Sequence, residues 1–351
     1  MQKELSIYRQ LSNNNTKRQK LAENNIDADQ IEFETQVLPA ICGSLNAFQN
    51  ENFCYDLTCR LFKRWLSRQM IKHFFEEITI DLLVAYLFQH DSHVYPSNNS
   101  HLSMFIRVIE FIGHFDFVKN VIFVNFNNSL TIERMDSIRQ SFNEQRANWP
   151  IMTIVTIHDR TPSQHTRLSP DTRIVFHLQK LAKIQLDQLR ESLQSFKPVK
   201  LRSLFKVNMN IFDIIIKLNT KFLPNKHESF DFPDNIQIKH TLYSANNNEQ
   251  HSMPIVDYNP AYIYLTMLKK AYENFALFFY DQYGGREIGV LLRPETLETR
   301  PFKYSSVDGT KLAGTAHSLS TDNVVINMEA LVEDFRIIGN GLVDTVIIKD
   351  A

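Results

Sequence analysis

The sequence predicts an α+β protein, with a mainly helical part first and a part that alternates strands and helices after it. Three observations indicate this class. Apolar residues recur at helical spacing over 37–113, short apolar runs typical of strands begin at residue 120, and residues 207–351 follow the order β-α-β-β-α-β. That order is the one of the ferredoxin-like fold. A chain of 351 residues with 43% apolar residues is long enough to bury more than one core.

The helical part begins after a polar leader. Residues 1 to about 36 are polar, rich in asparagine and without glycine, and we interpret them as a leader or as the end of a preceding helix. From residue 37 the pattern becomes helical, and apolar residues at every fourth position predict the buried face of a long helix: Leu57, Leu61 and Trp65, with Phe62 and Leu66 beside them. Two further helices are expected at about 76–89 and 102–113, with a polar loop at 91–103 between them.

A small α/β unit is expected to pack behind these helices. Its apolar runs alternate as strand, helix, strand and helix over 120–126, 131–149, 150–157 and 171–195. A basic link at 196–206 follows. We therefore predict one helical plus α/β domain over 37–200 and a second, α+β domain over 207–351.

The terminal domain is expected to hold four strands and two helices. The strands are predicted at 211–218, 275–281, 287–293 and 342–349, and the helices at 260–274 and 326–338. In the ferredoxin-like order, 211–218 and 287–293 are the central strands. The polar excursions that reach residue 254 and cover 294–323 are longer than ordinary loops, so we expect them to be surface additions.

Gly284 and Gly285 stand together in a chain with nine glycines and raise the question of a ligand loop. Phosphate-binding loops place their glycines between a strand and a helix. Here an apolar strand stands on each side, so the pair is predicted to be the structural corner of a β-hairpin. Glycine reaches positive φ there at little cost.

No residue pattern predicts catalysis, and no cofactor is expected. A nucleotide-adding enzyme holds two metal ions with paired carboxylates that follow a Gly-Ser pair. Gly43 and Ser44 are followed by Asp56, but Thr58 replaces the second acid. The remaining paired acids lie on the wrong side of Gly-Ser: Asp27 and Asp29.

Metal and disulfide chemistry are not predicted either. One loop gathers residues that fit either a metal site or an exposed turn, and their irregular spacing favours the turn: His90, Asp91, His93 and His101. Three cysteines without metal-site spacing indicate a reducing compartment: Cys42, Cys54 and Cys59. No apolar stretch reaches the roughly 18 residues of a membrane span, so no membrane partner is expected.

Two basic clusters are candidate RNA contacts, because lysine and arginine neutralise phosphates. The first is expected as a ridge on the first long helix: Arg60, Arg64, Arg68 and Lys72, with Lys63 beside them. The second lies in the link: Lys197, Lys200, Arg202 and Lys206. The alternative is a solvated helix face and an ordinary polar linker. The expected central strands offer only Phe212 for stacking on bases, so the usual readout of a ferredoxin-like RNA-binding domain is not predicted.

Six stretches, in order along the chain, resemble the C-terminal part of the nucleolar RNA-associated protein family, Nrap. They are RLFKRWLSRQM, EEITIDLLVAYLF, FIRVIEFIGHFDFVKNVIFVNFNNSLT, PIMTIVTIHDR, YDQYGGREIGVLLRP and VEDFRIIGNGLVDTV. The resemblance covers about Thr35 to Ile348. It extends over the last third of the family's longer proteins.

The resemblance implies a fold and a role. Residues 37–200 would form a helical domain like that of poly(A) polymerase and oligoadenylate synthase. The Lys63-Arg64-Trp65 segment is similar to a helix that helps hold the triphosphate in active polymerases. The implied function is a non-catalytic, RNA-associated scaffold of the small-subunit processome in the nucleolus, which acts in pre-rRNA processing and ribosome biogenesis.

The implied partners are pre-ribosomal RNA, small nucleolar ribonucleoproteins and other processome proteins. Two alternatives stay open. The chain would be an accessory part of a template-independent nucleotidyltransferase whose catalytic domain lies outside it, or a pure protein-interaction module.

Overall fold

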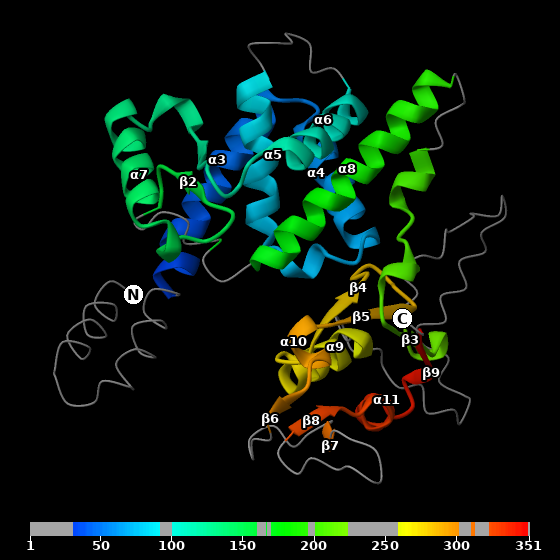
Figure 1. The fold of residues 1–351 in the computed structure, drawn as a ribbon. Helices are drawn as coiled ribbons and strands as arrows, with labels where there is room; N and C mark the ends of the chain where they lie inside the picture. The colour runs from blue at the N-terminus through cyan, green and yellow to red at the C-terminus, as the bar shows by residue number, and fades with distance from the viewer. Residues whose placement is uncertain are drawn as a thin grey trace, which may run out of the picture. The chain divides into compact units, whose positions relative to one another are not determined.

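The structure, a computed structural model, describes residues 31–91, 100–159, 166, 170–195, 201–223, 259–301, 310–312 and 323–349. Contacts divide the chain into two compact units (Figure 1). The first takes the described residues up to Leu66 and from Ile71 to Lys206. The second takes Ser67–Met70 and the described residues from Val207 onward.

The first unit is built mainly from helices. They are α3 (Leu38–Glu51, preceded by the π-helical turn η1, Phe33–Val37), α4 (Tyr55–Arg68), α5 (Glu77–Asp91), α6 (His101–His114), α7 (Ile132–Glu144) and α8 (Thr172–Gln194). Short 3₁₀ turns join them: η2 (Lys72–Phe74), η3 (Phe126–Asn128), η4 (Arg146–Asn148) and η6 (Leu201–Phe205). Side chains cap three of the helices at their first turns, from Ser100, Thr131 and Asp171.

A two-stranded parallel sheet completes this unit. Strand β1 (Ile122–Val124) pairs with β2 (Ile154–Thr156), with Ile122 opposite Ile154. Both strands are shorter than predicted. The predicted helix over 131–149 ends at Glu144 and continues as the separate turn η4.

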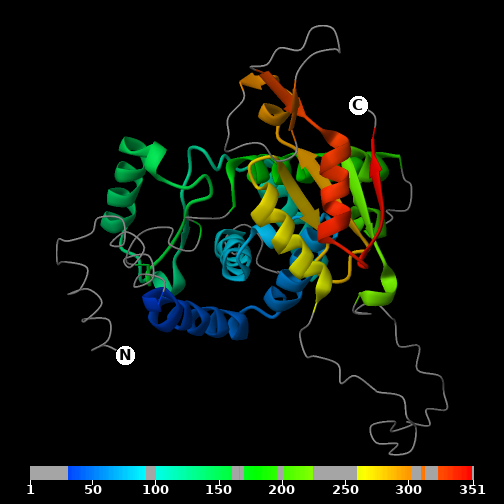
Figure 2. The same cartoon turned by 90° about the horizontal axis from the view of Figure 1, so that it is seen from below.

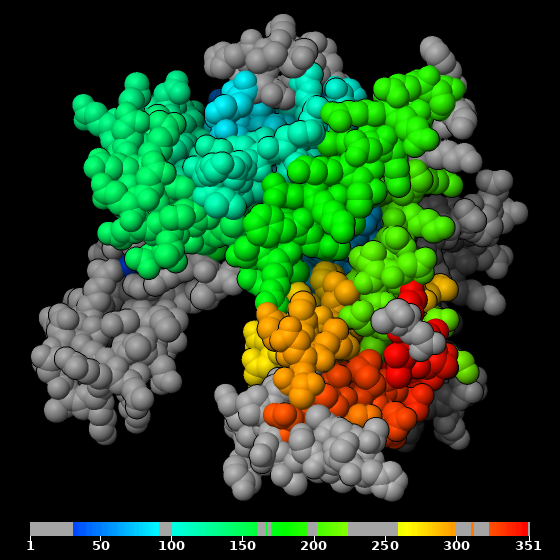
Figure 3. Space-filling view, viewed as in Figure 1, coloured from blue at the N-terminus to red at the C-terminus, as the bar shows by residue number. Residues whose placement is uncertain are grey.

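Helix α5 lies at the centre of the first unit, between α3 and α6 in Figure 1. Its apolar residues run all round the helix rather than along one stripe, and four consecutive ones are buried: Leu82, Leu83, Val84 and Ala85. Helices α6 and α8 pack along each other. Figure 3 shows the outer side of α8, in green, uncovered at the surface, and its exposed residues include Phe176 and Ile184.

The buried face of α4 differs from the predicted one at one edge only. Leu57 is 42% exposed, whereas Trp65 is fully buried. The buried stripe joins positions three and four apart: it keeps the predicted Phe62, Trp65 and Leu66 and adds Thr58. A polar residue is tolerated in this stripe because the Thr58 hydroxyl donates a hydrogen bond to the Cys54 carbonyl at 2.7 Å.

A buried polar bridge fixes this face of α4. The indole Nε1–H of Trp65 donates to Oε1 of Gln185 on α8 at 2.6 Å, and the Gln185 amide donates to the Leu204 carbonyl at 2.9 Å. Each of these bridging atoms, Nε1 of Trp65 and Oε1 and Nε2 of Gln185, has a hydrogen-bond partner, so burying the bridge carries no large desolvation penalty. The bridge sets the rotation of α4 about its axis, and hence the direction of its charged residues.

The second unit is a four-stranded antiparallel sheet with helices on one face. Its strands are β3 (Ile214–Leu218), β4 (Ala276–Tyr280), β5 (Glu287–Leu292) and β9 (Val343–Ile348), in the spatial order β4-β5-β3-β9. The expected central strands, now β3 and β5, are in the middle. Helices α9 (Pro260–Tyr272) and α11 (Met328–Ile338) cover one face (Figure 2). Between them lies an apolar core that includes Ile216, Leu265, Phe278, Val290 and Phe335.

The predicted polar excursion at 294–323 holds regular structure that the sequence did not indicate. It contains the short helix α10 (Pro294–Leu297) and two strands, β6 (Arg300–Pro301) and β7 (Thr310–Leu312). With β8 (Asn323–Ile326) they form a second antiparallel sheet in the order β6-β8-β7. These strands are too short to show a clear alternation of apolar and polar residues. Two further 3₁₀ turns flank β3: η7 (Met209–Ile211) and η8 (Thr220–Phe222).

The glycine pair is the corner of the β4–β5 hairpin, as predicted, with Tyr280 opposite Ile288. Gly284 has φ of +106°, and the Gly285 N–H donates to the Asp281 carbonyl at 2.8 Å. The positive φ therefore falls on Gly284. Gly285 is required for space, because an added Cβ would come within 3.0 Å of Asp281 and the Tyr280 ring. Within the described part of the chain, we find no helix of the length and apolarity needed to cross a bilayer.

Candidate nucleic-acid interface

Helix α4 carries four of the predicted RNA-contacting residues, Arg60, Lys63, Arg64 and Arg68, and it ends at Arg68. The chain then turns sharply, because Met70 adopts a positive φ of 63°. The predicted ridge therefore stops at Arg68. Residues four apart share a side of a helix only while the helix lasts.

Lys72 does not continue the ridge as expected. It lies on the 3₁₀ turn η2, is 3% exposed, and forms an ion pair with Glu77 at the start of α5. A buried ammonium requires such a partner, because an uncompensated charge in the interior is costly. Lys72 is therefore placed as a structural residue.

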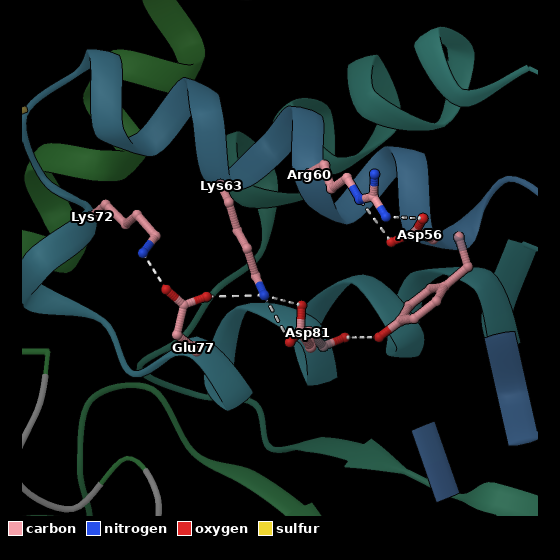
Figure 4. Close-up of polar contacts among 7 residues, drawn as sticks. Asp56, Arg60, Lys63, Lys72, Glu77 and Asp81 are labelled. Atoms are coloured by element: carbon pink, nitrogen blue, oxygen red, sulfur yellow. Dashed lines mark hydrogen bonds and ion pairs between the residues drawn. The ribbon is translucent and has the colours of Figure 1, made fainter. Parts of the chain in front are cut away.

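Lys63 lies at the centre of a charge network between α4 and α5 (Figure 4). Its Nζ is 2.8 Å from both carboxylate oxygens of Asp81 and 3.0 Å from Oε2 of Glu77. Tyr55 adds a hydrogen bond from its hydroxyl to the Asp81 carbonyl at 2.9 Å. The Lys63 side chain is only 21% exposed. Two acids thus compensate the charge that was predicted to face a phosphate.

Burial and pairing shift the titration of this network. Burial alone would lower the pKa of Lys63, but hydrogen bonds and charge from Asp81 and Glu77 outweigh it, so the pKa is raised. For Glu77, hydrogen bonds from Lys72 and Lys63 outweigh burial and lower the pKa. Burial raises the pKa of the neighbouring Cys59 thiol, which therefore stays protonated and unreactive near neutral pH.

The remaining cations of α4 differ in exposure. Arg60 is 73% exposed and pairs with Asp56 one turn earlier, at 2.9 Å. Arg64 is half-buried. Of the predicted residues on this helix, Arg60 is therefore the most accessible to a ligand. Its ion pair with Asp56 is weakened by solvent.

Arg68 instead belongs to the second unit, where it holds a buried carboxylate. Its guanidinium lies 3.3 Å from Oδ2 of Asp281, whose side chain is 4% exposed. The same carboxylate accepts hydrogen bonds from the Ser67 hydroxyl and from the Tyr283 N–H. Asp281 begins the corner of the glycine hairpin, so Arg68 stabilises that corner.

A cavity of about 350 Å³ adjoins the network in the first unit. Its lining joins α3, α4 and α5, and includes Cys42, Arg60, Lys63 and Asp81. Its lining contains two ion pairs, the more exposed Arg60–Asp56 and the partly buried Lys63–Asp81. A phosphate there would have to displace an acid from Lys63.

The second predicted cluster is described in part. Lys197 and Lys200 lie outside the described residues, while Arg202 and Lys206 lie in or just after η6 and are both exposed. Their side chains are in contact with solvent and are available to a polyanion.

The described residues that were considered for catalysis lie on helices α3 and α4. Gly43 and Ser44 lie inside helix α3, and the Ser44 hydroxyl is 2.8 Å from Nε2 of His158. Asp56 pairs with Arg60, and Thr58 is buried against its own helix. Asp27 and Asp29 lie outside the described residues. Among the side chains that are described, no group of three or more His, Cys, Asp or Glu is arranged to hold a metal ion.

The histidines of the predicted loop do not form one described cluster. His93 lies outside the described residues, and the side chain of Asp91 is not described. His90 is in the last turn of α5, where its ring lies 4.0 Å from that of Tyr86. His101 is the exposed first residue of α6, so the helix begins inside the segment predicted as loop.

Sequence reasoning missed the acids that compensate the ridge. Glu77 and Asp81 are one turn apart at the start of α5, so they face the same side of that helix. This spacing was a usable signal. Which neighbour that side faces is decided by packing.

Comparison with known proteins assigns both units to domains of one protein family. Residues 53–207 match the model of the Nrap protein PAP/OAS1-like domain 5, and residues 209–346 match the model of Nrap protein domain 6. The chain is therefore a mixed helix-and-sheet protein with a PAP/OAS1-like domain followed by a further Nrap domain. It belongs to the Nrap family and corresponds to the C-terminal part of that family's proteins.

Its relatives share the name Nucleolar protein 6. The chain is 34% identical over 317 residues to that protein of Homo sapiens, 33% identical over 321 residues to that of Xenopus tropicalis, and 26% identical over 324 residues to that of Drosophila melanogaster. Each match covers 90% of this chain, but 27%, 27% and 26% of the three relatives. The chain thus spans about a quarter of the length of the relatives it matches.

Proposed function

We propose that this chain is a non-catalytic, RNA-associated scaffold module of ribosome biogenesis that works in the nucleolus. We place it in the small-subunit processome, with pre-ribosomal RNA, small nucleolar ribonucleoproteins and other processome proteins as partners. The observation that carries the proposal is the match, in order, to Nrap domains 5 and 6, together with relatives named Nucleolar protein 6. We also infer a ferredoxin-like arrangement of the second unit, which its antiparallel order β4-β5-β3-β9 supports.

The scaffold role is supported by the state of the residues nearest to a nucleotidyltransferase motif. Asp56 is paired with Arg60, and Thr58 stands where a second carboxylate would be needed, with its hydroxyl bonded to the Cys54 carbonyl. Two-metal catalysis requires carboxylates that converge on the ions. These contacts support a chain that does not itself carry a two-metal catalytic site.

Primer extension tests the non-catalytic part. The purified chain is incubated with a labelled RNA oligonucleotide, nucleoside triphosphates and Mg²⁺ or Mn²⁺, and we expect no added nucleotides. Metal-dependent extension that is abolished by Asp56→Asn, or by replacing Asp27 and Asp29, would refute it.

Exposed cations carry the RNA contact in this proposal. Arg202 and Lys206 are uncovered, and Arg60 is held by a solvent-exposed pair. Arg68 and Lys72 are not assigned this role, because each compensates a carboxylate within the fold.

Salt-dependent binding to single-stranded RNA tests this surface. Arg202→Glu with Lys206→Glu should weaken binding, and log K should lose about 0.7 of slope against log salt for each phosphate contact removed. A control with the same charge change at exposed positions elsewhere, Lys119→Glu with Lys221→Glu, should bind as the wild type does. A wild-type chain that binds no RNA at low salt would favour the third possibility, a pure protein-interaction module. Crosslinking in cells, with mapping of the RNA-linked peptides, is the matching test in vivo.

A further inference from the structure

A second and larger cavity lies in the first unit, away from the predicted basic residues. It encloses about 670 Å³, which is within the roughly 300–1,000 Å³ of small-molecule sites. Its lining comes from α3, the end of α5, β1, the turn η3 and α7. These segments are far apart in the sequence, so no local pattern indicated the cavity.

Aromatic rings form the wall of this cavity: Phe48, Tyr86, Phe88, Phe123 and Phe126. Within this wall Phe48 packs edge-on against Phe126 at 5.9 Å and against Phe88 at 6.5 Å between ring centres. Phe88, Phe123 and Phe126 are buried, whereas Phe48 and Tyr86 are half-buried. The wall is therefore fixed by packing and still presents ring surface to the cavity.

A cation stands at this wall. The guanidinium carbon of Arg139 lies 5.0 Å from the centre of the Phe123 ring. Arg139 forms an ion pair with Asp136 at 2.8 Å, and both side chains are more than half exposed. Such a pair is weak and can exchange its partner for another anion. Aromatic faces beside an arginine are the combination that single-stranded nucleic acids use, with the base stacked and the phosphate paired.

Two strained asparagines stand at the rim. Asn127 and Asn128 have φ of 54° and 53°, and both are exposed. Two consecutive left-handed residues other than glycine cost free energy, and such strain is concentrated at functional sites. Among the described residues, neither side-chain amide has a hydrogen-bond partner.

The residue before them keeps this turn in place. Asn125 accepts a hydrogen bond from the Leu130 N–H at 2.7 Å, donates one to the Leu130 carbonyl at 3.2 Å, and gives its own N–H to Oε1 of Gln89 at 3.1 Å. The turn is thus pinned at its base, and two amides are held at the mouth of an aromatic cavity. Asparagine amides match the donor and acceptor edge of a nucleobase.

We propose that this cavity binds an unpaired nucleotide of single-stranded RNA. The base lies against the half-buried rings of Phe48 and Tyr86, the amides of Asn127 and Asn128 bind its edge, and Arg139 pairs with its phosphate. The inference rests on the proposed function, which supplies RNA as the partner. An aromatic side chain of a partner protein would use the same rings, but it would leave the two strained amides and the arginine without a role.

The decisive variant removes the amides and keeps the turn. Glycine adopts positive φ without strain, so Asn127→Gly with Asn128→Gly should keep the fold and a melting temperature within about 2 °C of wild type. The probe is a 5′-fluorescein-labelled single-stranded 12-mer, as rA, rU or rC, measured by anisotropy with the full chain. A fully paired RNA hairpin serves as the second probe. We expect the variant to lose about fivefold or more in affinity for at least one single strand and to bind the hairpin as wild type does.

A second variant tests the phosphate contact against a matched control. Arg139→Gln should flatten the salt dependence on single strands by about 0.7 in slope. The control, Lys119→Gln, removes another exposed cation that pairs with an aspartate three residues earlier, Asp116, and should leave the slope unchanged.

The outcomes separate this inference from the proposed function. A wild-type chain that binds RNA, with variants that bind equally well, would overturn the cavity site alone. Equal losses on single strands and hairpin would overturn it too, because no unpaired base would then be read. A photo-crosslinker can be placed at Ala47, an exposed residue of the cavity lining. Capture of a protein instead of RNA in nuclear extract would also overturn the cavity site. A wild-type chain that binds no RNA would refute the RNA part of the proposed function itself.

Discussion

Replacing Lys63 by methionine tests whether the charge network between α4 and α5 stabilises the first unit. The ammonium contacts both Asp81 and Glu77 at 2.8–3.0 Å, and the side chains of Lys63 and Asp81 are 21% and 23% exposed. Removing one partner of a fully buried pair costs roughly 3–5 kcal/mol, and of an exposed pair about 0–1 kcal/mol. For this intermediate burial we expect a loss of about 2 kcal/mol.

Urea and thermal unfolding, followed by tryptophan fluorescence, measure this loss. Both tryptophans of the chain, Trp65 and Trp149, lie in the first unit, so the signal follows that unit. A loss of about 2 kcal/mol corresponds to a decrease of roughly 4–8 °C in Tm for a unit of this size.

Two further variants keep this test specific. Arg60→Met removes an exposed pair on the same helix and should cost about 0.5 kcal/mol or less. Lys63→Met combined with Asp81→Asn should recover about 1 kcal/mol, because the uncompensated carboxylate is then removed. A free energy of unfolding for Lys63→Met that lies within about 0.5 kcal/mol of the wild-type value would contradict this prediction, because a difference of that size is near the error of such comparisons.

Three other predictions concern glycines and pH. Gly284→Ala and Gly285→Val should each lower the free energy of unfolding by about 1 kcal/mol or more, the first because φ is positive and the second because the new side chain meets the Asp281 carbonyl. Gly43→Ala lies inside a helix with open space around it and should raise the free energy of unfolding by about 0.5–1 kcal/mol. Chemical unfolding measures all three changes. Gly289→Ala should destabilise the second unit, because its Cβ would lie 2.6 Å from a buried phenylalanine ring; retained stability would show that the ring can move. The pKa of Glu77 is lower in the folded protein, so its contribution to stability is full above the unfolded pKa of about 4.3 and is lost as the pH falls through the folded pKa. Glu77→Gln should therefore make the free energy of unfolding fall less steeply with pH on the acid side. Parallel curves for the variant and the wild type would contradict this.

Much of the second unit could be predicted from local pattern. The two apolar runs on either side of Gly284 and Gly285 specify a hairpin, because a helix would have to follow the glycines in a phosphate loop. The central places of β3 and β5 follow from the order of the elements. The small sheet of β6, β7 and β8 was missed, since strands of two to four residues leave no measurable alternation.

The basic ridge shows where local pattern fails. Periodicity places Arg60, Lys63 and Arg64 on α4, but it does not predict that the helix ends at Arg68 and that Met70, two residues later, has a positive φ. Nor does it say that Lys63 meets an acid 18 residues later in the sequence. The charge of a lysine can be read from the sequence, whereas the environment that compensates it is created by packing.

The sequence by itself determined that the chain is an α+β protein resembling the Nrap family, and it determined the longer helices, the strands of the main sheet of the second unit and where the hairpin turns. These properties follow from side-chain periodicity and backbone preferences over a few residues. Only the tertiary structure decided which cations are compensated by acids, as Lys63 is, and which rings surround one cavity. Coulomb energies and stacking depend on distances of a few ångströms and on burial, and both arise when residues as far apart as Phe48 and Arg139 are brought together by the fold.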